Sequence, residues 1–527
     1  MMAIMNADWA IANAKIWTGH SERPWATGMR IQDGSIASVE ASSGDADGID
    51  LAGRFVTPGL IDAHLHFLMG GESLQTLDLS DVSSPDEFRK RVLVEHESLE
   101  PDRWLVATGW SENRWDPPIV PDSSWLSGCG DRPVVCWRMD MHSALVNDVV
   151  MDLLDLPDDE TLLAEGGHVV RDIHGKPTGL LQEAAAWHHL NPRIPELPEH
   201  IRAKAIETAT SHCLSLGITA VRTMEYKRDL LGLFLDHHCE SPGIRMSAVV
   251  LDRTLPLDLE WTEQMPRDDW FRITGCKSFL DGTLGSRTAR LLSPYADDPG
   301  NCGSCMEHLL EDRLDEWVEQ VVSLGFAPVM HAIGDAAVLA AIEAIQDLPD
   351  NCRATIEHAE VMTPRIVEAL SERPDLRLSV QPLHRADDAV YAAVALGPER
   401  TGSLLPMATV SGLGVRLAFG SDWPIVSVDP IAGMAAAITA KDVEGKPFHQ
   451  EEAIGVEEAL RGYTVLAAEA AGLDHVGVLE PGRKADFVVW DRNPFDVDWS
   501  HERPSIVATV VDGRLAFGNL PAEEHSS

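Results

Sequence analysis

Positive charge is scarce in this chain. Its 527 residues include 42 lysine and arginine residues against 84 aspartate and glutamate residues, so the formal net charge is −42. A surface this acidic repels phosphate backbones and anionic lipid headgroups. No apolar run reaches the ~18 residues that a membrane helix needs, and the first residues do not follow the pattern of a signal peptide. We therefore expect a cytoplasmic protein with neither nucleic acid nor membrane as a partner.

Cysteine is also scarce. Eight cysteines are spread irregularly over the chain, which excludes the dense disulfide framework of a small secreted protein. Cys302 and Cys305 have the spacing of half a zinc site. Because no second pair has this spacing, we interpret them as free thiols in a loop.

Both ends of the chain carry β-hairpin signals. Asp33-Gly34 and Asp512-Gly513 each separate two short runs of alternating hydrophobic residues. Such a dipeptide is typical of a two-residue hairpin loop. We predict one small β-sandwich domain built from residues 1–57 and 475–520.

Between these ends, expected strands alternate with expected helices. Eight strand–helix units indicate an α/β fold, namely a (β/α)8 TIM barrel, over residues 58–85 and 191–474. A TIM barrel carries its chemistry at the carboxyl ends of its strands. The expected strands cover residues 56–66, 217–225, 245–252, 273–282, 327–331, 354–358, 376–382 and 415–422.

Residues 86–190 interrupt this alternation. The segment is too long for a strand–helix connection and contains two expected strands of its own, at 103–110 and 132–140. We interpret it as an inserted subdomain that covers the barrel mouth and sets specificity.

Five potential metal ligands fall at the ends of the expected barrel strands. His64 and His66 end the first strand, and residues i and i+2 of a strand point to the same side. His331 and His358 end the fifth and sixth strands, and Asp422 ends the eighth. Any one of them is explained by a structural hydrogen bond or a turn. Together at one rim, imidazole and carboxylate groups indicate a site for zinc or a similar divalent cation.

Lys277 lies inside an apolar run that we expect to be the fourth strand. Burial and neighbouring cations lower the pKa of an amine, and a neutral amine can add carbon dioxide to form a carbamate. A carbamate can bridge two metal ions. The alternative is an ordinary ion pair with Asp281 or another acid.

Three longer motifs accompany these residues: KSFLDGTLGSRTA at 277–289, GKPTGLLQE at 175–183 and RMDMHSALVN at 138–147. With the order His-x-His, Lys, His, His, Asp, they make the chain resemble the amidohydrolase superfamily. The motifs are similar to those of amidohydrolase family 3, the YtcJ-like group that includes N-substituted formamide deformylase. The resemblance covers nearly the whole chain.

The resemblance implies a binuclear centre, with zinc as the expected cation. His64, His66 and Asp422 would hold the first ion, His331 and His358 the second, and carbamylated Lys277 would bridge them. Cys276 and Glu183 are rivals for the bridging position. Asp422 would also act as the general base and then the general acid.

The implied reaction is hydrolysis of a small-molecule amide, with a linear N-formyl or N-acyl amine as the expected substrate. Alternatives of the same fold are a cyclic-amide hydrolase and a deaminase. An alternative of another class is a non-catalytic regulatory or binding protein, and a homodimer is expected for this fold.

We expect His142 to contact the oxyanion from above, since Arg138, Asp140 and His142 alternate on one strand face. Three of the expected substrate contacts have an alternative role. Trp110 could pack in a core, Arg287 could form a surface ion pair, and His384 could lie in a loop away from the site. The expected substrate contacts are Trp110, Arg138, Glu183, Asp281, Arg287, Gln381 and His384.

Overall fold

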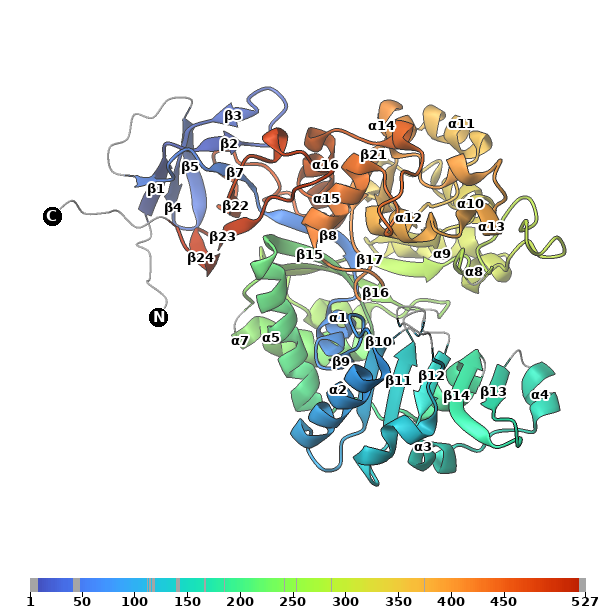
Figure 1. Cartoon of the computed structure of the whole chain (residues 1–527). Coiled ribbons are helices and arrows are strands. Elements are labelled where there is room, and N and C mark those ends of the chain that lie inside the picture. Colours follow the sequence, from blue (N-terminus) through green and yellow to red (C-terminus); the bar gives the residue numbers. More distant parts are fainter. Residues whose placement is uncertain are drawn as a thin grey trace. The chain divides into compact units, whose positions relative to one another are not determined.

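The computed structural model divides the chain into two compact units (Figure 1). One unit contains Met1–Gly70 and Ile206–Ser527, and the other contains Gly71–Ala205. The structure describes residues 8–40, 48–110, 112, 115, 119–138, 143–164, 167–183, 185–240, 242–252, 254–285, 287–373 and 375–520.

The larger unit contains an eight-stranded, all-parallel sheet that confirms the predicted barrel. Its strands run in the order β21-β20-β19-β18-β17-β16-β15-β8. The backbone N–H groups of Ser421 and Asp422 donate to the carbonyl oxygen of His64, which joins the last strand end to the first. The strands are β8 Leu60–Leu65, β15 Ile218–Glu225, β16 Arg245–Leu251, β17 Phe271–Phe279, β18 Ala327–Ala332, β19 Thr355–His358, β20 Arg377–Val380 and β21 Arg416–Phe419.

Helices connect these strands, as the parallel arrangement requires. Helix α11 (Pro364–Glu372) begins at Pro364, with Thr363 as the residue before it. The main helices of this unit are α5 Glu199–Ser215, α9 Leu314–Ser323, α10 Asp335–Ile345, α11 Pro364–Glu372, α12 Pro382–Asp388, α15 Pro430–Thr439, α16 Val456–Gly462 and α17 Val465–Ala471. None of the helices in the described ranges combines the length and the apolar character that crossing a bilayer requires.

The expected first barrel strand, 56–66, is in fact two strands. β7 (Phe55–Pro58) pairs with β22 (Phe487–Trp490) and β2 (Lys15–Trp17) outside the barrel, whereas β8 belongs to the barrel. Gly59 lies between them, and a Cβ atom at this position would come within 2.1 Å of Thr219 Oγ1. The missing side chain therefore allows the chain to pass from one sheet to the other against β15.

Both chain ends contribute to two further sheets, in the orders β5-β4-β1-β6 and β24-β23-β22-β7-β2-β3. The two predicted hairpins are confirmed, since Asp33, Gly34, Asp512 and Gly513 all have positive φ and follow one another as two-residue loops. The strands are β1 Asp8–Ala12, β2 Lys15–Trp17, β3 Trp25–Ala26, β4 Gly28–Gln32, β5 Ser35–Glu40, β6 Ile49–Asp50, β22 Phe487–Trp490, β23 Ile506–Val511 and β24 Arg514–Gly518.

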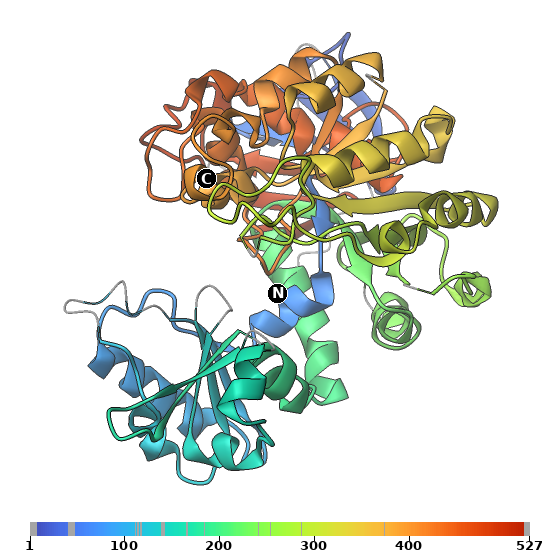
Figure 2. The same ribbon diagram turned by 90° about the vertical axis from the view of Figure 1, so that its right-hand side faces the viewer.

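The smaller unit has its own six-stranded sheet, in the order β13-β14-β12-β11-β10-β9, with helices beside it (Figure 2). It extends beyond the expected 86–190 at both ends. At the first end the reason is that β9 pairs with β10. Its elements are β9 Leu77–Asp78, α2 Pro85–Ser98, β10 Leu105–Trp110, β11 Val134–Arg138, β12 Ser143–Val146, α3 Asp148–Leu153, α4 Asp159–Ala164, β13 Gly167–Arg171 and β14 Pro177–Glu183.

Candidate metal centre

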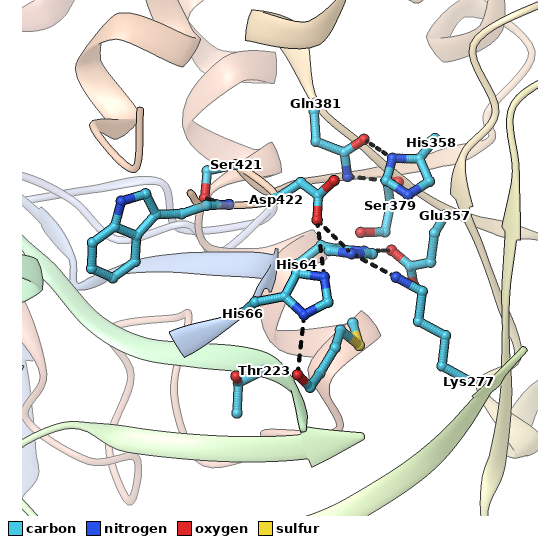
Figure 3. A network of polar contacts seen from close by, with 12 residues as sticks. His64, His66, Thr223, Lys277, Glu357, His358, Ser379, Gln381, Ser421 and Asp422 are labelled. Carbon is cyan, nitrogen blue, oxygen red and sulfur yellow. Dashed lines mark hydrogen bonds and ion pairs between the residues drawn. The ribbon is translucent and has the colours of Figure 1, made fainter. Parts of the chain in front are cut away.

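The carboxyl ends of the barrel strands bring the predicted ligands together, and Figure 3 shows all of them except His331. Asp422 Oδ1 lies 3.2 Å from His64 Nε2 and 3.4 Å from His66 Nε2. His64, His358 and Asp422 place one donor atom each within 4.8 Å of one another. The ring of His331 lies 4.5 Å from that of His358, measured between centroids. Residues that are far apart in the sequence thus form one cluster of potential ligands.

Two of these histidines have their Nδ1 atoms engaged by oxygen. His64 Nδ1 lies 2.5 Å from Glu357 Oε2, and His66 Nδ1 lies 3.2 Å from the carbonyl oxygen of Met224. An Nδ1–H group that donates to these oxygens leaves the lone pair on Nε2. Both Nε2 atoms face Asp422, which is the arrangement expected of metal-ligating histidines.

The other two histidines follow the same rule. His358 Nδ1 lies 2.8 Å from Gln381 Oε1, which leaves Nε2 available. His331 is turned the other way, because its Nε2 lies 3.2 Å from the carbonyl oxygen of Gly282 and its Nδ1 is the available atom. Each of the four predicted histidines is thus held by an oxygen at one ring nitrogen and turns the other nitrogen into the cluster.

Burial keeps three of these imidazoles neutral. It lowers the pKa of His66, brings the pKa of His331 to about 3, and holds the pKa of His358 well below its ordinary value. Burial acts in the opposite direction on Asp422, but the neighbouring histidines, His64 first, hold the pKa of its carboxyl well below the usual range. Neutral imidazole and ionised carboxylate are the protonation states that bind a cation.

Lys277 is buried in β17 and points into this cluster. Its Nζ atom lies 3.0 Å from His64 Nε2 and 4.7 Å from the centroid of the Phe279 ring. Burial lowers the pKa of Lys277, although the charges of Asp422 and Glu357 oppose this shift. The environment therefore favours the neutral amine more than water does.

Three residues bear on the role of Lys277, namely its expected ion-pair partner and the two side chains that could replace it as the bridging group. Asp281 accepts hydrogen bonds from the backbone N–H groups of Arg290, Ile333 and Gly334, so the expected alternative of a Lys277–Asp281 pair is not found. Burial raises the pKa of the Cys276 thiol to about 12, which keeps it protonated. Glu183 ends β14, but its side chain lies outside the described residues.

The donor set fits a divalent cation. Asp422 Oδ1, Glu360 Oε2 and His384 Nε2 are buried atoms without a hydrogen-bond partner in the part of the chain that the structure describes. A second group of potential ligand atoms, on His358, Glu360 and His384, shares His358 with the first group. Buried polar atoms that lack partners are costly unless an ion or water satisfies them.

Two of the expected substrate contacts lie at this centre. Gln381 holds His358, and His384 stacks on the His358 ring at 5.8 Å between centroids. His384 Nε2 lies 3.9 Å from Asp422 Oδ2, and its Nδ1 lies 3.4 Å from Glu360 Oε1. The alternative of a loop position for His384 is wrong, since the residue belongs to α12.

The structure explains other expected contacts by internal bonding. Trp110 is 1% exposed, and its Nε1 donates to the carbonyl oxygen of Cys136, so it is a core residue, as the alternative held. Arg138 pairs with Glu112 at 3.0 Å, and Arg287 makes bonds from two guanidinium nitrogens to Asp297. His142 lies outside the described residues.

Sequence reasoning missed Glu357, Arg222 and Glu360. Strand alternation places Glu357 on the opposite side from His358, but His358 and Ala359 have positive φ, so the chain leaves the strand geometry there. Arg222 is a charged residue in a strand with several apolar residues, whereas β19 has the sequence TIEH. The signal that drew attention to Lys277 would therefore have found Arg222 but not Glu357.

A family model described as the amidohydrolase family matches residues 47–517. The chain belongs to the amidohydrolase family. This confirms the resemblance inferred from the motifs, and it places the chain in a family of hydrolases that are typically metal-dependent.

Three curated relatives match this amidohydrolase over most of its length. Protein LONG AFTER FAR-RED 3 of Arabidopsis thaliana is 31% identical, over 97% of this chain and 92% of the relative. The putative amidohydrolase YtcJ of Bacillus subtilis is 28% identical, over 95% and 98%. N-substituted formamide deformylase of Arthrobacter pascens is 24% identical, over 97% and 98%.

A solved structure has the same fold. An uncharacterized metal-dependent hydrolase from Pyrococcus horikoshii OT3 superimposes with a TM-score of 0.75 at 27% identity, over 94% of this chain and 99% of the other. The fold of this chain thus has a counterpart in a solved structure.

Proposed function

We propose that this protein hydrolyses a carbon–nitrogen bond of a small linear amide, an N-formyl or N-acyl amine, at a centre of two divalent cations. The observation that carries the proposal is the common orientation of four histidines. Each binds an oxygen acceptor through one ring nitrogen and leaves the other free beside Asp422 or within the same cluster. The name of the Arthrobacter pascens relative supports the choice of substrate class.

His64, His66 and Asp422 would hold one cation, and His331 and His358 the other. Bound cations would supply an ionised water near neutral pH and polarise the substrate carbonyl. Lys277 would bridge as a carbamate: its neutral amine forms a new N–C bond to carbon dioxide, and the nitrogen loses a proton. The lowered pKa of Lys277 supports this step.

Asp422 would move the proton. Its carboxylate, ionised at neutral pH, accepts a proton from the attacking water and then donates it to the nitrogen of the leaving amine. The products are a carboxylate and an amine.

His384 is the strongest candidate for a substrate contact. Its Nε2 has no partner among the described residues and lies beside Asp422, while Glu360 holds the opposite ring nitrogen. Gln381 would contribute by holding the ring of His358. Asp281 would contribute by accepting hydrogen bonds from three backbone N–H groups. His142, Glu183, Arg138 and Arg287 remain predictions, and the core position of Trp110 removes it from the first tests.

The decisive experiment loads the purified protein with zinc and measures amine release from a panel of N-formyl and N-acyl amines. Cyclic amides and amino-purines serve as substrates for the alternative reactions. We expect turnover of linear amides and at least a ~10³-fold loss in Asp422→Asn, as for the removal of a general base. Circular dichroism should show an unchanged fold in that variant.

Each other outcome identifies an alternative. Turnover of a cyclic amide alone, or ammonia release from an amino-purine with one zinc ion per chain, would replace the proposal with a cyclic-amide hydrolase or a deaminase. Failure to bind zinc at all would favour a regulatory protein on this scaffold.

A further inference from the structure

We propose that Glu357, held by Arg222, is a positioning residue that orients His64 and strengthens cation binding at the half of the centre that contains His64. This inference rests on the proposed function only in assuming that the centre binds cations. Glu357 itself is not placed as a ligand, because its two oxygens are already engaged.

The contact between Glu357 and His64 lies inside the barrel. Glu357 Oε2 lies 2.5 Å from His64 Nδ1, and both side chains are fully buried. The residues belong to β19 and β8, which are not neighbours in the sheet (Figure 3). A bond between side chains across the barrel fixes the ring more firmly than a bond to a mobile surface group.

Glu357 is fixed in turn through its other oxygen. Oε1 accepts hydrogen bonds from Arg222 Nη1 at 3.1 Å and from Thr355 Oγ1 at 2.9 Å. The Nε and Nη2 atoms of Arg222 have no hydrogen-bond partner in the described ranges, so its bonds to Glu357 and Thr355 are what hold the guanidinium. A buried carboxylate needs such a counter-charge. Pairing with Arg222 therefore keeps Glu357 ionised, so the group that accepts from His64 Nδ1 is a carboxylate.

This charge sets His64 apart from the other histidines. His358 is held by the neutral amide of Gln381, and His66 by a backbone carbonyl. An anionic acceptor makes the stronger hydrogen bond and makes the opposite ring nitrogen a better ligand. His64 Nε2, which faces Asp422 and Lys277, should thus bind its cation more tightly than His358 Nε2 binds the other.

Two reciprocal substitutions separate this role from a structural one. Glu357→Gln keeps a hydrogen-bond acceptor and removes the charge, whereas Gln381→Glu places a charge behind His358. Zinc titration against a chromophoric chelator, with metal content per chain, measures the tighter and the weaker binding step separately. The readout does not depend on any catalytic activity.

We expect Glu357→Gln to weaken the tighter step by about 10–100-fold, as found for groups that hydrogen-bond to zinc-ligating histidines. Gln381→Glu should strengthen the weaker step. Asp486→Asn is the matched control, because it removes the charge of another buried carboxylate, one that pairs with Arg245 and not with a candidate ligand. Both binding steps of this control should stay within about twofold of the wild type, since the partners of the candidate ligands are unchanged.

Removal of Glu357 leaves Arg222 with an unpaired buried charge, so the single variant could fail to fold. The double variant Arg222→Met/Glu357→Gln removes both charges and should fold while keeping the weakened tight step. Unchanged zinc affinity in the folded variants, or equal weakening of both steps, would overturn the proposal. Wild-type zinc binding without amide hydrolysis would instead overturn only the proposed function.

Discussion

The interior of the barrel and the core of the smaller unit are built from different side chains. In the smaller unit, Phe88 and three tryptophans pack ring against ring, with centroid distances between 5.5 and 6.3 Å. In the barrel, Asp62, Arg222 and Glu357 are buried beside the candidate ligands. One interior removes apolar surface from water, and the other removes charges from water.

These two kinds of burial have opposite effects on stability. Apolar burial contributes roughly 25 cal/mol per Å², whereas a buried polar group costs free energy unless it is paired. The cost in stability of the charged side chains inside the barrel therefore points to a binding role for this interior. Substitutions of Lys277 and the candidate ligands should impair cation binding with little loss of stability, and substitutions in the aromatic core should do the reverse.

Lys277→Met should show the largest effect and test the barrel side of this contrast. It removes the buried amine and hence the bridging group, so turnover of a linear amide should fall by at least ~10³-fold. The free energy of unfolding should not decrease, because an apolar side chain replaces an amine that burial disfavours. Metal analysis, amine release and urea unfolding check these outcomes. A loss of stability without loss of metal would contradict the contrast.

Trp110→Ala tests the aromatic core of the smaller unit. This tryptophan is 1% exposed, so its truncation should destabilise the smaller unit by about 3–5 kcal/mol. Zinc binding measured on the folded protein should be retained. Ile173→Ala is the control, since Ile173 is 95% exposed in the same unit and should change stability by less than about 0.5 kcal/mol. Equal effects of the two variants in urea unfolding would refute the core assignment.

Asp62→Asn tests a buried charge that supports the barrel. Asp62 accepts the backbone N–H groups of His64 and Ser421, and burial raises its pKa to about 7. The native protein therefore binds a proton that the unfolded chain has lost between about pH 4 and pH 7, so its stability falls as pH rises through this window. Asparagine removes this dependence, which is on the order of 4 kcal/mol across the window.

The pH dependence of this variant is measured by urea unfolding of both proteins at pH 5 and pH 8. The stability of Asp62→Asn relative to the wild type should rise between these values. A relative stability that is equal at both values would show that Asp62 is ionised in the native protein.

Arg287→Gln should have the smallest effect. The pair with Asp297 is partly exposed, and such pairs contribute about 0.2–1 kcal/mol. KM for a linear amide should change by less than about twofold if this pairing is the role of Arg287. A tenfold rise in KM with unchanged kcat would instead support the original expectation that Arg287 binds a substrate carboxylate.

Much of the fold was predictable because its signals are local. Asp33-Gly34 and Asp512-Gly513 specify their hairpins by backbone conformation alone. The eight barrel strands follow from short apolar runs between amphipathic helices. The division of the first expected strand into β7 and β8 was not predictable, because the contact between Gly59 and Thr219 joins residues distant in the sequence.

The candidate ligands were predictable for a related reason. A parallel barrel places all its carboxyl strand ends at one rim, so a histidine or an aspartate at each end is informative without coordinates. The role of Trp110 could not be assigned in this way, since a tryptophan suits a core and a substrate site equally well.

The sequence by itself determined the barrel, the residues at its rim and the family, because strand period and strand ends are properties of neighbouring residues. Only the tertiary structure decided which nitrogen of each histidine is free, and it did so through Glu357, Gln381 and two backbone carbonyls. These partners come from other strands and loops. Hydrogen bonds across a barrel depend on distances that no local pattern encodes.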